Sequence, residues 1–178
     1  MTQTVPLQVH PPFDDTFIDD LLQWPESSQF ECKRLAGKLT TVLESVVALA
    51  NSEGGIIALG FEDPGKAKGR ARVFGIQENS TNWDELRRQL QSRITEPNLL
   101  PCSPVEIGCT LRDGTMGSVV FLKIEKSNRI HSIVDDGTWV RLEKGNKELT
   151  ANEINDLSFA RGTISVEAQL EPIDVELL

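Results

Sequence analysis

The clearest pattern of apolar positions in the chain lies between residues 38 and 61. Its first half repeats apolar residues with the three- and four-residue spacing of one buried helix face: Leu39, Val42, Leu43, Val46, Val47 and Ala50. Asn51 follows this face and is expected to cap the helix end, before Gly54 and Gly55 break the helix. Residues 55–61 are apolar on both sides and predict a central strand. In a phosphate-binding P-loop the glycines precede a helix, whereas here they follow one, so this pattern excludes a P-loop.

Shorter patterns on both sides of this segment predict the other helices and strands. Helical spacing predicts helices over residues 17–22, 83–95 and 151–160. Their expected N-caps are Asp14 or Asp15, then Asn82, then Thr150 in a capping box with Glu153. Alternating patterns predict a strand in the second half of residues 26–34 and another over residues 66–76. Three or four further strands are expected among residues 105–111, 118–125, 130–134 and 138–142. Because helices and strands do not alternate strictly, the predicted class is α+β, with a mostly antiparallel mixed sheet packed against a few helices.

This order of elements indicates one main domain with an extension at each end. We expect residues 1–19 to form an N-terminal arm and the start of the first helix, because three prolines fall within the first twelve positions. The domain itself is expected to span residues 20–160. Residues 161–178 are expected to be a tail that leads into a downstream domain or pairs with a partner, because the pattern ends there without a closing element.

Composition narrows the possible functions. The net charge of −9 argues against a protein that coats DNA indiscriminately, since such proteins bind by neutralising phosphates. Any nucleic-acid contact must therefore use a local basic patch or a metal site. The first fifteen residues lack the basic and apolar regions of a secretory signal, and no apolar run is long enough for a membrane span. We expect a cytoplasmic protein that makes no membrane contact and keeps its three cysteines reduced.

Three carboxylates form one candidate site. Glu31 and Lys33 share a face of their predicted strand, Glu26 lies just before it, and Asp63 lies where the central strand ends. If the two strands are neighbours, Glu26, Glu31 and Asp63 could converge and hold Mg²⁺ or Mn²⁺, with Lys33 beside them. Such an ion can activate water for phosphodiester cleavage. The alternative is a solvated strand face next to a turn acid.

Basic residues form a second candidate site. Lys66, Lys68, Arg70 and Arg72 alternate along the predicted strand over residues 66–76 and would share one face. Arg129, Arg141, Lys144 and Lys147 lie on or near later strands that could adjoin it. This patch could follow a phosphate backbone, or its charges could simply protect an edge strand from aggregation. His131 has no evident serine or cysteine partner, which argues against a nucleophile–histidine pair.

Three blocks of sequence together resemble a known family. ESSQFECK, VVALANSEGGIIALGFED and WVRLEKGNKELTANEI occur in this order and are similar to blocks of the Schlafen-type AlbA-like domain, over roughly residues 20–160. The resemblance implies nucleic-acid binding within a regulatory or defence protein. In animal Schlafen proteins similar domains cut RNA with a metal held by two glutamates and an aspartate, which fall here on Glu26, Glu31 and Asp63. Those enzymes grip RNA with two lobes, so a clamp of this kind would need a homodimer.

Three functions therefore stay open at this point. The first is a nucleic-acid-binding domain for RNA or DNA that uses the basic residues. The second is a metal-dependent endoribonuclease, with Glu26, Glu31 and Asp63 as ligands and Lys33 in the catalytic site. The third is a protein-interaction or nucleotide-sensing module, which the negative net charge favours.

Overall fold

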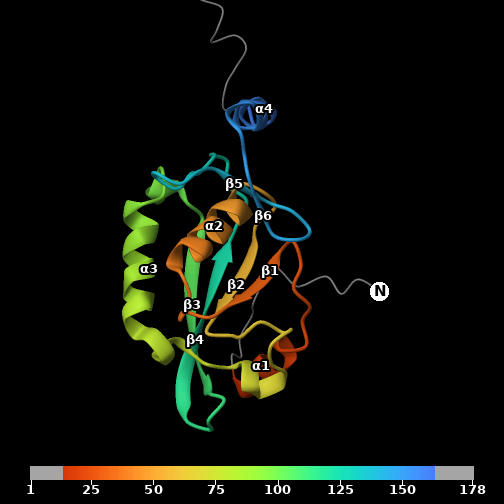
Figure 1. Ribbon diagram of the computed structural model, residues 1–178, viewed down its shortest axis with the longest axis vertical. Helices are drawn as coiled ribbons and strands as arrows, with labels where there is room; N and C mark the ends of the chain where they lie inside the picture. Colours follow the sequence, from red (N-terminus) through yellow and green to blue (C-terminus); the bar gives the residue numbers. More distant parts are fainter. Residues whose placement is uncertain (1–13, 163–178) are drawn as a thin grey trace, which may run out of the picture.

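A four-stranded mixed sheet forms the centre of the protein (Figure 1). The computed structural model describes residues 14–162. In this range the sheet has the order β1-β2-β4-β3, with β1 (Phe30–Lys33) parallel to β2 (Gly55–Leu59). The other two strands, β3 (Cys102–Thr110) and β4 (Met116–Ile124), pair antiparallel, and β4 also pairs antiparallel with β2. The predicted α+β class with a mostly antiparallel sheet is confirmed.

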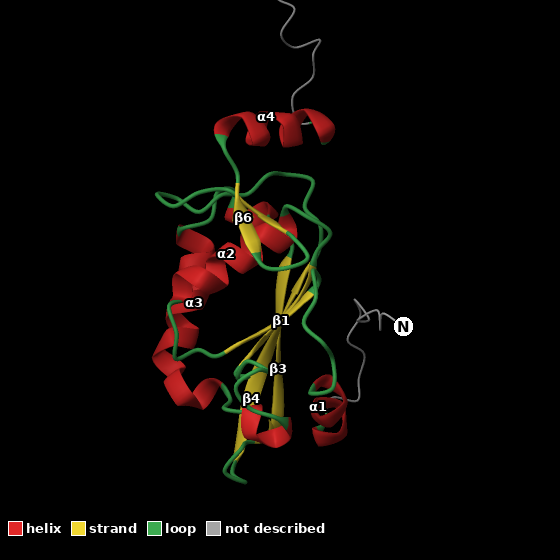
Figure 2. Cartoon of the chain, turned by 45° about the vertical axis from the view of Figure 1, so that its right-hand side comes forward, coloured by secondary structure: helices red, strands yellow, loops and turns green. Residues whose placement is uncertain are grey.

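Helices cover both faces of the sheet, as the edge-on view in Figure 2 shows. The long helices α2 (Leu39–Ala50) and α3 (Ser80–Ser92) lie on one face and the short helix α1 (Asp15–Leu21) lies on the other. Every residue of β2 is buried, because each face of this strand meets one of two apolar clusters. The predicted pair of amphipathic helix and central strand is therefore confirmed.

The segment between β1 and β2 is a strand–helix–strand unit. Because β1 and β2 are parallel, the chain must cross back over the sheet between them, and α2 makes this crossover. As a result the carboxyl ends of both strands finish at the same end of the sheet. The residues that follow each strand gather there, and this geometry positions the candidate site described below.

A small hairpin and a last helix complete the described chain. The hairpin pairs β5 (Trp139–Arg141) with β6 (Asn146–Glu148) and packs against α2, and α4 (Ala151–Ala160) follows it. Thr150 and Glu153 form the predicted capping box. Arg161, just after α4, donates hydrogen bonds to the backbone carbonyls of Asn51, Ser127 and Arg129. This guanidinium thus ties the end of α4 to the domain.

Several predicted elements differ from the structure. The segment 66–76 is not a strand but contains the 3₁₀ turn η1 (Gly69–Arg72) and the start of another, η2 (Ile76–Asn79). The run 130–134 is not a strand either, since only Ile133 forms isolated bridges. Asn79, rather than Asn82, caps α3, with its side chain accepting from the Asn82 N–H. A short 3₁₀ turn, η3 (Pro97–Leu99), and β6 were not predicted.

The predictions for the two ends of the chain concern residues that lie largely outside the described range. Residues 1–13 of the expected arm and residues 163–178 of the expected tail are not described. Asp14 caps α1 by accepting from the Phe17 N–H at 3.0 Å, as expected for one of its two candidate caps. No helix within residues 14–162 is long and apolar enough to cross a membrane.

All three cysteines are free thiols. Burial raises the pKa of Cys32 and of Cys102 to about 12, and raises that of Cys109 to about 11. They are therefore protonated at neutral pH, and none of them has the character of a nucleophile.

Candidate nucleic-acid interface

A polar pocket lies where β1 and β2 end. Lys33 is the last residue of β1 and Arg34 follows it, while Glu62 and Asp63 follow β2 after a short connection. Because the two strands are parallel, these residues meet at one end of the sheet, the position where open sheets with parallel strands commonly bind ligands. Together with Lys66 they line a pocket of about 390 Å³.

The arginine of this pocket is held in place on all sides. Arg34 pairs with Glu62 at 2.9 Å and with Glu78, and its guanidinium lies 3.7 Å from the centre of the Phe74 ring. The pKa of Glu62 is lowered first by the hydrogen bond from Arg34 and then by that from the Asp63 N–H. The charge of Arg34 is thus balanced by two acids, and its main role is to shape the pocket.

The lysines of the pocket are the cations best placed to meet a ligand. Lys33 contacts Glu31 at 2.8 Å and keeps about a fifth of its side chain exposed. Lys66 is exposed and forms no ion pair with any residue of the described range. Asp63 is also exposed, but one of its carboxyl oxygens accepts the Gly65 N–H at 2.6 Å and so closes the turn. Lys66 is therefore the most available positive charge at this pocket.

Glu31 belongs to an ion-pair network beside the pocket. Its two carboxyl oxygens pair with Lys33 at 2.8 Å and with Arg141 at 3.0 Å. Burial raises the pKa of Glu31, but Lys33 and Arg141, with a hydrogen bond from Ser45, outweigh burial and lower it below its ordinary value. Arg141 also donates to the Asn146 side chain and to the Ser27 carbonyl. Arg141 is thus held by internal contacts, with only 6% of its side chain exposed, and its predicted phosphate-binding role stays a prediction.

The three predicted metal ligands have separate contacts. Glu26 is exposed and accepts the Cys32 N–H at 3.1 Å, along the free edge of β1. Glu31 pairs with two cations, and Asp63 closes its own turn. Across the described residues no three histidine, cysteine or acidic side chains are grouped so that they could hold a metal ion. What the structure does bring together is Lys33 and Asp63, which line the same pocket.

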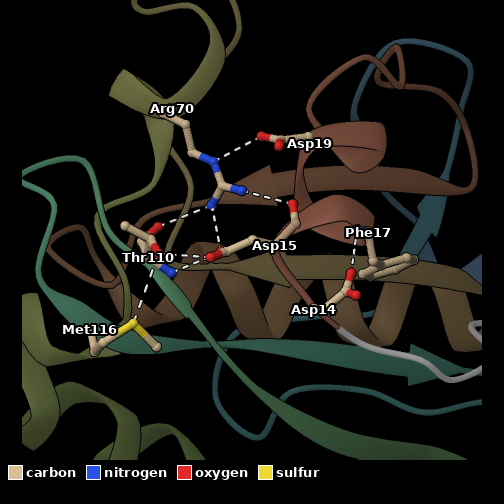
Figure 3. A network of polar contacts seen from close by, with 7 residues as sticks. All are labelled: Asp14, Asp15, Phe17, Asp19, Arg70, Thr110 and Met116. Atoms are coloured by element: carbon tan, nitrogen blue, oxygen red, sulfur yellow. Dashed lines mark hydrogen bonds and ion pairs between the residues drawn. The ribbon is translucent and has the colours of Figure 1, made fainter.

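Two of the predicted phosphate-binding arginines are bound internally, as Figure 3 shows for Arg70. Arg70 pairs with Asp15 at 3.0 Å and with Asp19 at 2.8 Å, and donates to the Thr110 carbonyl at 3.0 Å. Arg72 is 2% exposed and donates to the carbonyls of Glu62 and Leu22. Because the segment is a 3₁₀ turn and not a strand, these side chains do not share a solvent-facing row with the lysines.

The other predicted cations are exposed but are not gathered into one patch. Lys68 lies near Lys66, before η1, whereas Lys144 and Lys147 belong to the β5–β6 hairpin. Figure 1 shows the hairpin and the yellow segment that contains η1 at opposite ends of the sheet. Lys147 pairs with Glu153, while Arg129 lies in the loop that Arg161 contacts. The single basic row expected from the sequence is therefore divided into two groups.

Two buried polar residues have partners that sequence spacing could not reveal. The Asn51 side chain donates to the carbonyls of His131 and Trp139 at 2.7 and 2.9 Å and accepts the His131 N–H at 2.8 Å. It therefore joins the end of α2 to two later segments, in addition to lying at the helix end. His131 does have a serine partner, Ser127, at 2.8 Å. Because His131 is fully buried and Ser127 is 4% exposed, the pair packs the core and does not face a substrate.

Comparison with known proteins places this fold in context. No curated protein matches the chain. Among solved structures, the DIP2311 protein from Corynebacterium diphtheriae is similar in fold, with a TM-score of 0.50 and 16% sequence identity. The match covers 75% of this chain and 27% of the Corynebacterium chain, so this chain corresponds to about a quarter of that protein.

The sequence model of the family described as Schlafen, AlbA_2 matches residues 26–150, which include both parallel strands, the pocket and the hairpin. This protein therefore belongs to the Schlafen AlbA_2 family.

Proposed function

We propose that this domain binds nucleic acid, RNA or DNA, at the pocket where β1 and β2 end. The observation that carries the proposal is the position of Lys66, an exposed lysine without an ion pair in the described range, beside Lys33 in a pocket of about 390 Å³. Membership of the Schlafen AlbA_2 family supports it, since such domains are associated with nucleic-acid binding.

The charges of the pocket favour a phosphate backbone as the ligand. Lys66 and Lys33 can each donate to a phosphate oxygen, and ligand binding would draw Lys33 partly away from Glu31. The nearby acids Glu62 and Asp63 keep the local charge balanced, so binding rests on few phosphate contacts. The affinity should therefore be modest and should fall as salt rises, with a slope of about 0.7–0.9 for each phosphate contacted.

The test measures the fluorescence anisotropy of labelled transfer RNA and of labelled duplex DNA as the protein is added. The titrations are made at salt concentrations from about 50 to about 200 mM, where binding through phosphate contacts depends strongly on salt. Lys66→Ala should weaken binding and reduce the salt slope by about one phosphate contact. The matched control is Arg88→Ala, which removes another exposed cation, 72% exposed, from α3, a helix that lies on one face of the sheet (Figure 2) and does not line the pocket. Equal affinity and slope in Lys66→Ala and the wild-type protein would place the interface elsewhere.

The same complex tests the expected homodimer. A clamp built from two copies would present two of these pockets to one nucleic acid. Light scattering of the complex gives the number of chains per nucleic acid: two would support the clamp, and one would mean that a single domain binds alone.

A further inference from the structure

A second pocket opens next to the first, between η2 and the tip of the β3–β4 hairpin. It has a volume of about 550 Å³, and its lining includes Phe74, Leu111, Arg112 and Met116. The two pockets share a wall. Arg34 lines the first pocket, and its guanidinium stacks on the Phe74 ring, which lines the second. The two pockets are therefore neighbours on the surface of the domain.

The apolar part of this second pocket is unusually open to solvent. Met116 is 74% exposed, the largest exposed fraction among the large apolar side chains of the described residues. Its sulfur lies 3.8 Å from the Thr110 hydroxyl, a contact that Figure 3 shows. Phe74 is half-buried, so part of its ring also faces outward. The exposed thioether of Met116, which lines the same pocket as Phe74, offers a surface on which a flat ring can pack.

One cation of the second pocket is available to a ligand. The Arg112 guanidinium lies 4.3 Å from the centre of the Phe74 ring, and its backbone is fixed by a hydrogen bond from its N–H to the Val73 carbonyl at 2.8 Å. Arg34 packs on the same ring but is paired with two acids, whereas Arg112 is exposed and ion-pairs with no residue of the described range. Arg112 therefore combines an available positive charge with a position beside apolar surface.

We propose that this second pocket receives an unpaired nucleotide of the strand bound at the first pocket, and that the ligand class is accordingly single-stranded nucleic acid. The inference rests on the proposed function. The base would pack on the Met116 thioether and against the exposed edge of Phe74, since the guanidinium groups of Arg34 and Arg112 already stack on the Phe74 ring. Arg112 would contact the phosphate of the same nucleotide. A duplex keeps its bases stacked on one another, so it would present only phosphates here and would gain nothing from Met116.

The polar groups of the pocket point to binding without base preference. The Gln77 side-chain amide donates to the Ser118 hydroxyl and its oxygen accepts the Ser118 N–H. Asp113 accepts from both the N–H and the hydroxyl of Thr115. Glu78 is paired with Arg34. Because these groups already have partners, few remain to read the edge of a base, and the recognition should depend on stacking.

The test compares a mixed-sequence single strand with a duplex of the same length and sequence, both labelled, by fluorescence anisotropy at 50 mM salt. Met116→Ala should raise the Kd for the single strand by about tenfold and leave the Kd for the duplex within about twofold. Arg112→Ala should raise the Kd for both, because a phosphate contact does not depend on unstacked bases. Leu99→Ala, another exposed apolar residue at 52%, and Arg88→Ala are the matched controls and should change neither. Melting temperatures equal to that of the wild-type protein would show that all four variants fold.

The outcomes separate this inference from the proposed function. If Lys66→Ala weakens binding but Met116→Ala and Arg112→Ala do not, the second pocket is not a nucleotide site and the first pocket stands alone. If both second-pocket variants weaken single strand and duplex equally, the pocket contacts phosphates only and the single-strand preference is wrong. If the wild-type protein binds neither oligonucleotide, the proposed function fails, and this inference fails with it.

Discussion

Glu31 and Arg141 lie 110 residues apart in the chain and are joined by an ion pair of 3.0 Å beneath the β5–β6 hairpin. Both side chains are largely buried, at 16% and 6% exposure. The pair fastens the hairpin to β1, and so to the strand that carries Lys33 into the candidate interface. A glutamate that by family resemblance would hold a metal ion is, in this structure, also a structural anchor.

The first prediction concerns Glu31→Gln. The substitution removes the negative charge that Lys33 and Arg141 share, and it leaves a nearly buried guanidinium without its carboxylate. We expect the free energy of unfolding to fall by about 2 kcal/mol, the range for hydrogen bonds to charged groups. Urea unfolding followed by tryptophan fluorescence measures this change. Glu26→Gln is the control, because Glu26 is exposed and should cost much less; equal losses would contradict the anchoring role.

The second prediction concerns acid. The pKa of Glu31 in the folded protein lies below its ordinary value of 4.5, so ionised Glu31 stabilises the fold fully above about pH 4.5. This contribution is lost as the pH falls from 4.5 through the lower folded pKa, because the carboxyl then takes up a proton. The stability of the wild-type protein should therefore decrease over this range more steeply than that of Glu31→Gln. Melting curves from pH 6 to about pH 3 test this, and parallel curves would contradict it.

The third prediction reverses the expectation that the sequence raised for Arg70. Its contacts with Asp15, Asp19 and Thr110 join η1 to α1 and to the end of β3 (Figure 3). Arg70→Ala should lower the free energy of unfolding by about 1–2 kcal/mol, a range that allows for partial exposure of these groups. Nucleic-acid affinity and its salt slope should stay unchanged in the folded variant. Anisotropy titrations performed below the melting temperature check this, and a reduced salt slope would return Arg70 to the interface.

The fourth prediction separates binding from cleavage. Labelled transfer RNA is incubated with the protein and Mn²⁺, and in parallel with a chelator. We expect the RNA to stay intact in both, because the carboxylate of Glu31 is occupied by Lys33 and Arg141. Cleavage that requires Mn²⁺, and that is lost in both Glu31→Gln and Asp63→Asn, would instead establish the metal-dependent endoribonuclease. Whether or not cleavage occurs, Lys66→Ala should lower the affinity for RNA both with Mn²⁺ and with the chelator.

Short-range sequence patterns were enough to predict the central helix and strand and the capping box of the last helix. The apolar face of α2 and the apolar strand β2 contain their own signals, because burial on one face or on two faces sets the spacing of apolar residues. The capping box of Thr150 and Glu153 is likewise a short-range interaction, and the structure contains it. The parallel pairing of β1 and β2, with the helix α2 between them, places Lys33 and Asp63 in one pocket.

Contacts between distant segments account for most of what local pattern missed. Alternating cations over residues 66–72 fit a strand equally well, but Gly69 adopts a φ of +56° and the segment turns. Arg70 then meets Asp15 and Thr110, which are 55 and 40 residues away along the chain. Asn51 and Arg141 depend on similar long-range partners. No spacing rule relates residues that are so far apart, so these roles appear only once the chain is folded.

The hydrogen bonds of Arg161 determine where the chain can be shortened without removing contacts of the domain. The match to the family ends at residue 150, which makes that position an obvious place to cut. A protein cut there would lose Arg161, whose guanidinium donates hydrogen bonds to three backbone carbonyls, including that of Asn51. The Asn51 side chain in turn joins α2 to β5. Shortened versions for crystallography or NMR should therefore extend through residue 162, so that the anchor of the last helix is kept with the domain it holds.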